Sequence, residues 1–255
     1  MNTFFCFDFS EPILMTSIHS GHDIPSFILQ GTKVEEEIRL REEDPYTDFF
    51  TEISSNRVNV RNSRFYCDLN RSFENCVYVN PEDAWGLEVR NKNFNSAMLE
   101  KCREEYLKFY RQITVFINEM LLHHNRIALF DIHSYNHHRL GSDKPFDNPE
   151  LNPDIILATH VLPESEVKFI GEIKNILEKE LPDLNIKINV KFDGGYFVRW
   201  VYRTYGKRVI PFSIEFKKIF MDEWTGKVDY EKQNIFRNAL QEILYFTKVH
   251  LINEK

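Results

Sequence analysis

The sequence predicts an α/β fold with helices on both faces of a central sheet. Short apolar runs typical of strands alternate along the chain with longer amphipathic segments typical of helices, and this alternation indicates an α/β sheet. The 255 residues, 42% of them hydrophobic, are enough to bury one large core. No internal repeat, low-complexity tract or Gly/Pro-rich linker divides the chain, so we expect a single domain over residues 1–255.

Strands are expected where a short apolar run is bounded by polar residues. Residues 126–133, R-I-A-L-F-D-I-H, form a run of this kind, which is typical of a buried strand whose carboxyl end carries chemistry. Residues 12–18 likewise run apolar into His19. The other expected strands are residues 3–9, 57–61, 64–69, 155–159, 186–191 and 209–216.

Helices are expected where apolar residues recur every three or four positions. Between Asn95 and His124 this spacing predicts the longest helix of the chain, or a kinked pair of helices. Residues 164–180 predict an amphipathic helix that ends before Pro182. The remaining expected helices are residues 34–41, 46–54 and 232–250.

Composition excludes several classes of function. The net charge of −7 argues against non-specific binding of nucleic acid, which needs a basic face. No run of about 18 apolar residues could form a membrane span, so neither a nucleic acid nor a membrane is an expected partner. The four cysteines form no C-x-x-C pair, which argues against a thiolate zinc cluster. We expect reduced thiols and a cytoplasmic location, because no secretory signal pattern precedes residue 30.

Polar residues gather at the ends of three expected strands. His19 follows one strand, His133 ends another, and Glu215 lies inside the apolar run S-I-E-F. The acidic segment E-E-D-P-Y-T-D, residues 42–48, lies between the first two. A single histidine at a strand end is more often structural, and acidic residues before a helix often only cap it. A carboxylate within an apolar strand is costly to bury unless it is paired or binds a metal.

Taken together, these side chains suit a hydrolytic metal site. Two imidazoles and one carboxylate can hold Zn²⁺ with a fourth position open for water, whose pKa the metal lowers. A nearby glutamate can move the proton of that water to a leaving amine. Asp131, two residues before His133 on one strand, faces the same side and either orients a ligand imidazole or caps a turn. Mn²⁺, Fe²⁺ or Co²⁺ would suit the same ligands.

Motifs in the first third of the chain resemble those of the N-formylglutamate amidohydrolase family. Residues 18–25, I-H-S-G-H-D-I-P, resemble the P-H-S-G-x-x-I-P segment that opens the family pattern. Residues 47–49, T-D-F, resemble the D-T-D-W segment. Residues 63–71, S-R-F-Y-C-D-L-N-R, resemble S-R-Y-V-V-D-L-N-R.

The resemblance continues in the same order to about residue 223. Residues 131–134, D-I-H-S, resemble D-x-H-S, and residues 192–199, F-D-G-G-Y-F-V-R, resemble F-K-G-G-Y-I-T-R. Residues 214–216 and 221–223 resemble the closing L-E-L and Y-M-D-E segments. Asp193 stands where the family tends to have lysine. Six matches in order are strong evidence for the superfamily.

The resemblance implies a fold and a set of metal ligands. The fold is a three-layer α/β/α architecture with a mixed, mostly parallel sheet, related to the zinc carboxypeptidases. The implied ligands of one Zn²⁺ are His19, Asp48 and His133. Glu43 and Asp44 lie close to Asp48 in the sequence and are alternatives for the carboxylate ligand.

The resemblance also implies the remaining active-site residues. Glu215 would be the general base, and Asn70 and Arg71 would bind a substrate carboxylate or stabilise the oxyanion. Arg199, after the Gly194-Gly195 loop, is a second candidate for anion binding, and paired glycines let the backbone approach a ligand closely. For Arg64 we expect a structural ion pair.

The implied activity is hydrolysis of the C–N amide bond of a small acidic N-acyl amino acid, or of a similar amide. One alternative is a peptidase that acts on a peptide end, as the zinc carboxypeptidases do. Another is a non-catalytic relative that binds a small molecule. Loss of His19, His133 or Glu215 would favour the non-catalytic relative, and all three are present.

Overall fold

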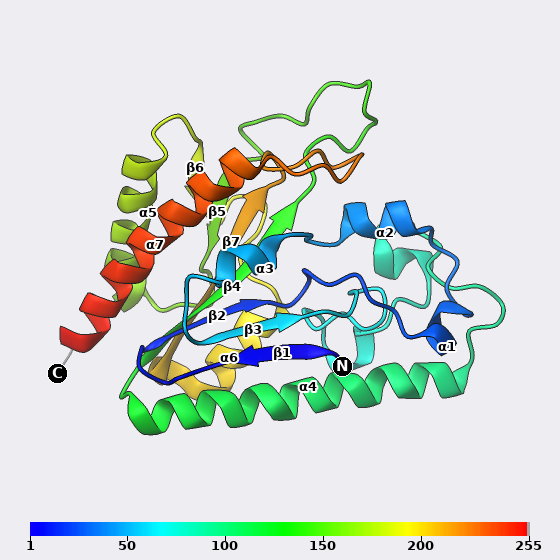
Figure 1. Cartoon of the computed structure of the whole chain (residues 1–255), viewed down its shortest axis with the longest axis horizontal. Coiled ribbons are helices and arrows are strands. Elements are labelled where there is room, and N and C mark those ends of the chain that lie inside the picture. The colour runs from blue at the N-terminus through cyan, green and yellow to red at the C-terminus, as the bar shows by residue number, and fades with distance from the viewer. Residues whose placement is uncertain (254–255) are drawn as a thin grey trace.

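The computed structural model describes residues 1–253, which fold around one seven-stranded sheet (Figure 1). The strand order is β1-β3-β2-β4-β7-β5-β6. Four of the six strand pairings are parallel, and only β1–β3 and β5–β7 are antiparallel, which confirms a mixed, mostly parallel sheet. The strands are β1 (Thr3–Cys6), β2 (Ile13–Ser17), β3 (Arg57–Val60), β4 (Ile127–Tyr135), β5 (Ile155–Ala158), β6 (Ile186–Ile188) and β7 (Val209–Lys217).

Helices cover both faces of the sheet and complete the expected three layers. Buried residues of α4 and α6 form one core against the sheet, and those of α5 and α7 form a second core on the other face (Figure 1). The helices are α1 (Ser26–Leu29), α2 (Glu36–Glu42), α3 (Thr47–Thr51), α4 (Ser96–His123), α5 (Val167–Glu180), α6 (Tyr196–Tyr205) and α7 (Tyr230–Asn253). Short 3-10 helices span Phe73–Asn75, Pro81–Ala84, Glu164–Glu166 and Gly206–Arg208.

The longest helix, α4, is one continuous element of 28 residues and not a kinked pair. It begins where the Asn95 side chain accepts a hydrogen bond from the Met98 backbone N–H, a cap that satisfies one of the free amides of the first turn. Its apolar stripe, which includes Phe109 and Ile113, is fully buried against the sheet. Burial of each such side chain contributes roughly 1.5–3 kcal/mol.

The centre of the sheet is built from β4 and β7, which pair in parallel over nine residues each. Every residue of both strands is buried. Side chains of a strand alternate between the two faces, so the alternate residues of β4 at 131, 133 and 135 share one face. This rigid pair of strands carries His133 and Glu215 toward their carboxyl ends.

Two expectations from the sequence differ from the structure. Residues 64–69 form turns and not a strand. Side chains there accept hydrogen bonds from backbone N–H groups: Ser63 Oγ accepts the Phe65 N–H, and Asp68 Oδ1 accepts the Asn70 N–H. These bonds compete with the backbone pairing of a strand. Helix α6 was not expected, because its sequence is rich in aromatic and β-branched residues, which favour strands.

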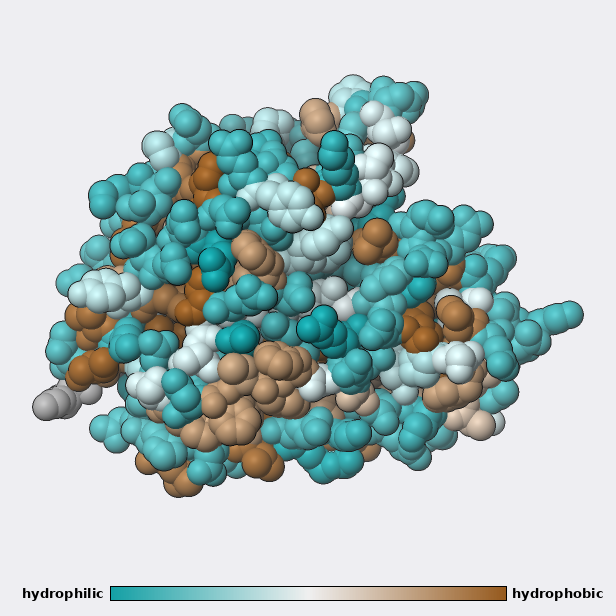
Figure 2. Space-filling view, in the orientation of Figure 1, coloured by the Kyte–Doolittle hydropathy of each residue, from teal (hydrophilic) through white to brown (hydrophobic). Residues whose placement is uncertain are grey.

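The surface offers no sign of a membrane span. Within residues 1–253, no helix has both the length and the apolar character needed to cross a bilayer. On the face shown in Figure 2, hydrophobic side chains gather over β1 and the adjoining part of α4, where Phe7 and Val115 are exposed. Hydrophilic residues cover most of the rest of this face.

Candidate metal centre and active site

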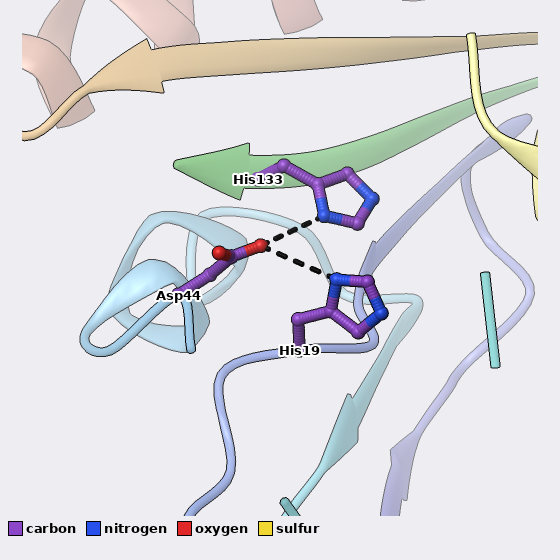
Figure 3. A group of neighbouring side chains, drawn as sticks. All are labelled: His19, Asp44 and His133. Carbon is purple, nitrogen blue, oxygen red and sulfur yellow. Dashed lines mark hydrogen bonds and ion pairs between the residues drawn. The ribbon is translucent and has the colours of Figure 1, made fainter. Parts of the chain in front are cut away.

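Two histidines and one aspartate converge at the carboxyl end of the sheet (Figure 3). His133 belongs to β4, His19 follows β2, and Asp44 lies in the loop between α2 and α3. Asp44 Oδ2 lies 2.9 Å from His133 Nδ1 and 3.5 Å from His19 Nδ1. One donor atom from each residue lies within 4.8 Å of the others, and all three side chains are buried. This compact set of N and O donors is what a divalent cation requires.

The outer nitrogen of each imidazole is bound to a second buried carboxylate. His19 Nε2 lies 2.7 Å from Asp68 Oδ1, and His133 Nε2 lies 2.7 Å from Asp131 Oδ2. Because a carboxylate only accepts hydrogen bonds, each Nε2 must carry the proton in these bonds. When the imidazole is neutral, the lone pair is therefore on Nδ1, the atom that faces Asp44. Imidazoles oriented in this way are typical of metal ligands, so the residues present fit a metal.

The two supporting carboxylates are themselves fixed. Thr16 Oγ1 donates to Asp131 Oδ1 over 2.6 Å. Asp68 accepts from Arg64 Nη2 over 2.8 Å and from the Tyr78 hydroxyl. Asp131 thus contacts the His133 imidazole, which was the first of the two roles considered for it. The expected ion pair of Arg64 is present, and it holds Asp68 against His19.

The carboxylate in this cluster is Asp44, not Asp48. Asp48 lies in the first turn of α3, where its backbone carbonyl accepts the Thr51 hydroxyl, and its side chain does not line the cavity that holds the histidines. Asp44 is almost fully buried, with 2% of its surface exposed. The two aspartates are four positions apart, and a sequence pattern cannot distinguish which of them the turn at residues 45–46 directs inward.

Charge within the cluster is strongly coupled. Burial alone would raise the pKa of Asp44, but hydrogen bonds from His133 and His19 and their positive charge hold it well below its usual value. Burial opposes a charge on His133, yet the carboxylates of Asp131 and Glu215 raise its pKa well above the ordinary value. The cluster therefore favours a positive charge at its centre.

Glu215 lies beside the cluster on β7 and lines the same cavity. Its register partner across the parallel pairing is His133. Burial raises the pKa of Glu215 to about 7; positive charge on His133 opposes this shift and the Asp44 carboxylate adds to it. A carboxylate whose pKa is raised toward neutrality can both accept and return a proton.

A cavity of about 250 Å³ opens onto these residues. Asn70, Gly194 and Gly195, which were expected to bind substrate, form part of its wall. Asn70 Oδ1 accepts the Phe197 N–H over 2.9 Å at the start of α6, which fixes the orientation of this side chain in the cavity wall. Gly195 is in tight contact with this amide, since a Cβ at Gly195 would come within 2.2 Å of Asn70 Nδ2.

Two predicted arginines lie outside the cavity wall. Arg71 stacks over the Tyr78 ring at 5.7 Å and donates to the Asp83 carbonyl. Arg199 is on the exposed face of α6, where it pairs with Asp193 at 2.8 Å. Neither side chain lines the cavity.

Several cavity residues were missed by the sequence reasoning. Lys218 follows β7 and is buried, with Nζ donating to the Glu43 carbonyl over 2.7 Å, to Asn136 Oδ1 over 2.8 Å and to the Arg41 carbonyl. Burial lowers the pKa of Lys218 to about 8. Two consecutive lysines, Lys217 and Lys218, at the end of a mainly apolar run are the signal that could have found it. Further lining residues that were not expected in the site include Glu42, Trp85, Arg139 and Lys191.

Comparisons with known proteins identify the family and the fold. The model of the N-formylglutamate amidohydrolase family matches residues 11–221. Among solved structures, an N-formylglutamate amidohydrolase from Ralstonia eutropha JMP134 aligns with a TM-score of 0.75 and 15% identity over 99% of each chain. A protein from Agrobacterium tumefaciens aligns with a TM-score of 0.66 and 15% identity, covering 93% of this chain and 92% of that one. No curated protein matches the sequence. Because the family model spans most of its length, this chain belongs to the N-formylglutamate amidohydrolase family.

Proposed function

We propose that the protein is a metal-dependent amidohydrolase that cleaves the formyl amide of N-formyl amino acids, with N-formylglutamate as the first candidate substrate. The observation that carries this proposal is the buried cluster of His19, Asp44 and His133 in the same cavity as Glu215 and Asn70. Family membership and the fold of the Ralstonia eutropha protein, named as an N-formylglutamate amidohydrolase, support the amide-hydrolase class.

His19 Nδ1, His133 Nδ1 and a carboxylate oxygen of Asp44 would hold the metal. Two nitrogens and one oxygen suit Zn²⁺ with one open position, and we propose one Zn²⁺ per chain, with another divalent metal as the alternative. When bound, such a metal supplies Lewis acidity, which polarises a carbonyl and makes water more acidic. Asp68 and Asp131 keep both imidazoles in the tautomer that binds a cation.

Glu215 is placed to act as the general base. It accepts a proton from the water that adds to the formyl carbon, and it passes a proton to the amino-acid nitrogen as the C–N bond breaks. Water is consumed, and formate and the free amino acid are released. The buried position of Glu215 suits both steps because burial raises its pKa toward neutrality.

Asn70 is placed to stabilise the negative charge that develops on the formyl oxygen. Asn70 lines the cavity and its oxygen accepts the Phe197 N–H in the first turn of α6, so its side chain is oriented before substrate arrives and its amide N–H₂ would be the donor. A preorganised donor of this kind is worth roughly 10²- to 10³-fold in rate. The Gly194-Gly195 loop leaves room for substrate beside it.

The test is hydrolysis of N-formyl-L-glutamate by purified protein, followed as formate release. We expect activity that a chelator removes and that about one equivalent of Zn²⁺ restores, with one tightly bound metal per chain by elemental analysis. The His19→Ala/His133→Ala double variant should lose both metal and activity. Protein that carries stoichiometric zinc yet hydrolyses no N-formyl amino acid would refute the proposed activity and leave a binding protein on a hydrolase fold.

A further inference from the structure

Cationic side chains line the cavity, and two of them are neutralised by their own carboxylates. Arg64 Nη2 pairs with Asp68 at 2.8 Å, and Arg139 Nη2 pairs with Glu42 at 3.1 Å. Each of these guanidinium groups is therefore already paired with a carboxylate of the protein. A substrate carboxylate would have to compete with a buried partner to bind either of them.

Lys218, a third cation of the cavity wall, forms all of its hydrogen bonds within the protein. Its ammonium group donates to two backbone carbonyls and to the Asn136 side chain, which uses all three of its donors. It has no donor left for a ligand. Its role is to hold the α2–α3 loop, which carries Asp44, against the end of the sheet.

Lys191 differs from the other three cations. Within residues 1–253 it pairs with no carboxylate, and its ammonium donates only to Asn152 Oδ1. The ammonium lies 4.4 Å from the centre of the Tyr135 ring and 5.6 Å from that of Phe192. Lys191 is an exposed residue of the cavity wall, and its one hydrogen bond leaves two donors available beside these aromatic faces.

The position of Lys191 relative to the reaction centre follows from β4. Tyr135 lies two residues after His133 on the same face of that strand, so the two side chains are about 7 Å apart along it. The Lys191 ammonium over the Tyr135 ring therefore lines the same cavity as His133 and Glu215.

The backbone around Lys191 is strained. Lys191 has φ +68° and Asn189 has φ +55°, in a region that non-glycine residues seldom adopt. Asn189 is held by accepting the Thr159 N–H over 2.7 Å. Strain of this kind persists where the surrounding structure fixes it and is frequent at ligand sites.

We propose that Lys191 is the specificity-determining residue that binds a carboxylate of the amino-acid portion of the substrate. The inference rests on the proposed function and assigns the anion-binding role that Arg71 and Arg199 do not fill, since both lie outside the cavity. It restricts the substrate class to N-acyl amino acids with a free carboxylate on the side of the amide that faces Lys191.

The test compares Lys191→Met, which keeps the length of the side chain and removes the charge, with Lys191→Arg and with Lys187→Met. Lys187 is an exposed lysine of β6 outside the cavity wall and is the matched control. With N-formyl-L-glutamate we expect Lys191→Met to raise KM roughly 10- to 100-fold with little change in kcat. Lys191→Arg should recover part of the loss, and Lys187→Met should behave as the wild type.

Two further substrates identify the carboxylate. N-formyl-L-glutamine lacks the side-chain carboxylate, and the α-amide of N-formyl-L-glutamate lacks the other. With the analogue that lacks the carboxylate bound by Lys191, the KM of Lys191→Met should be close to that of Lys187→Met. The interaction that the substitution removes is already absent in that case. A Lys191→Met variant with the same KM as the wild type on N-formyl-L-glutamate would overturn the inference.

A binding measurement separates this inference from the proposed function. Titration calorimetry with L-glutamate, the amino-acid product, needs no turnover. If zinc-loaded wild type hydrolyses no N-formyl amino acid, the proposed activity fails, but binding of L-glutamate that weakens at least about 10-fold in Lys191→Met still supports Lys191 as a carboxylate site. Equal binding by both proteins, or no binding by the wild type, overturns it.

Discussion

Glu215 and His133 occupy paired positions in the register of β7 and β4, two parallel strands at the centre of the sheet. Side chains at paired positions of neighbouring strands point to the same face, so the backbone itself fixes the separation of the proposed base from a proposed metal ligand. Both strands are fully buried, which leaves this spacing little freedom to change. Metal binding and proton transfer can therefore be separated by substitution.

Glu215→Gln should abolish turnover and leave metal binding intact. The amide has the shape of the carboxyl group but cannot accept the proton of water, so we expect kcat to fall by roughly 10²- to 10⁴-fold. Metal content per chain, measured by elemental analysis, should equal that of the wild type. A variant that retains more than about a tenth of the activity would remove Glu215 from the proton-transfer role.

The activity should decline in acid with the protonation of Glu215. The base works as the charged carboxylate, and burial raises its pKa to about 7, so the active fraction falls as pH falls through that value. A cation at the imidazoles favours the charged form and moves the decline to lower pH. The measurement is kcat/KM against pH at constant, verified metal occupancy. A profile with no decline in acid at any pH at which the protein keeps its metal would contradict this role.

Asp44→Asn and Asp48→Asn form a matched pair that tests the carboxylate ligand. The Asp44 oxygen faces both imidazoles, whereas Asp48 lies on α3 outside the cavity. We expect Asp44→Asn to lose most of its bound zinc and its activity, and Asp48→Asn to retain both. Elemental analysis of the two purified proteins decides between them, and loss of zinc from the Asp48 variant alone would restore the ligand expected from the sequence.

This pair also shows how far sequence reasoning reached. The apolar runs around His133 and Glu215 predicted both strands, because burial on two faces leaves a continuous apolar pattern. His19, His133 and Glu215 could be singled out, because polar residues at the ends of buried strands are costly unless they serve a purpose. The choice of Asp44 depended on the backbone of residues 45–46, where Tyr46 has φ +66°, and no periodicity encodes that turn.

The cavity wall was harder to predict for a similar reason. Arg71 and Arg199 have the right chemistry, but side-chain direction depends on tertiary contacts: Arg71 packs on Tyr78, and Arg199 pairs with Asp193. Lys191 lies in a loop whose unusual backbone conformation is imposed by distant residues such as Thr159. Long-range packing of this kind leaves no local signal in the sequence.

Asp131→Asn should weaken metal binding without removing a proposed ligand. Asp131 holds the Nε2–H of His133 at 2.7 Å and is itself fixed by Thr16. An amide in its place is a weaker acceptor and can turn the imidazole to the wrong tautomer, so we expect zinc affinity to fall roughly 10- to 100-fold. Competition with a chromogenic chelator measures the affinity. Unchanged affinity would mean that the Asp131–His133 contact is structural only.

Gly195→Ala should impair catalysis through Asn70. The added methyl group would approach Asn70 Nδ2 and Oδ1 at 2.2 Å, so the amide must move away from the Phe197 N–H that orients it. We expect kcat/KM to fall by roughly 10²-fold, the size of losing one oxyanion donor, with metal content unchanged. Gly171→Ala is the control, because a methyl group there, on α5, meets nothing within 4 Å and should be neutral or slightly stabilising. If the effect acts through Asn70, the Asn70→Ala/Gly195→Ala double variant should have nearly the same kcat/KM as Asn70→Ala alone. If the two losses of kcat/KM instead add fully, Gly195 does not act through Asn70.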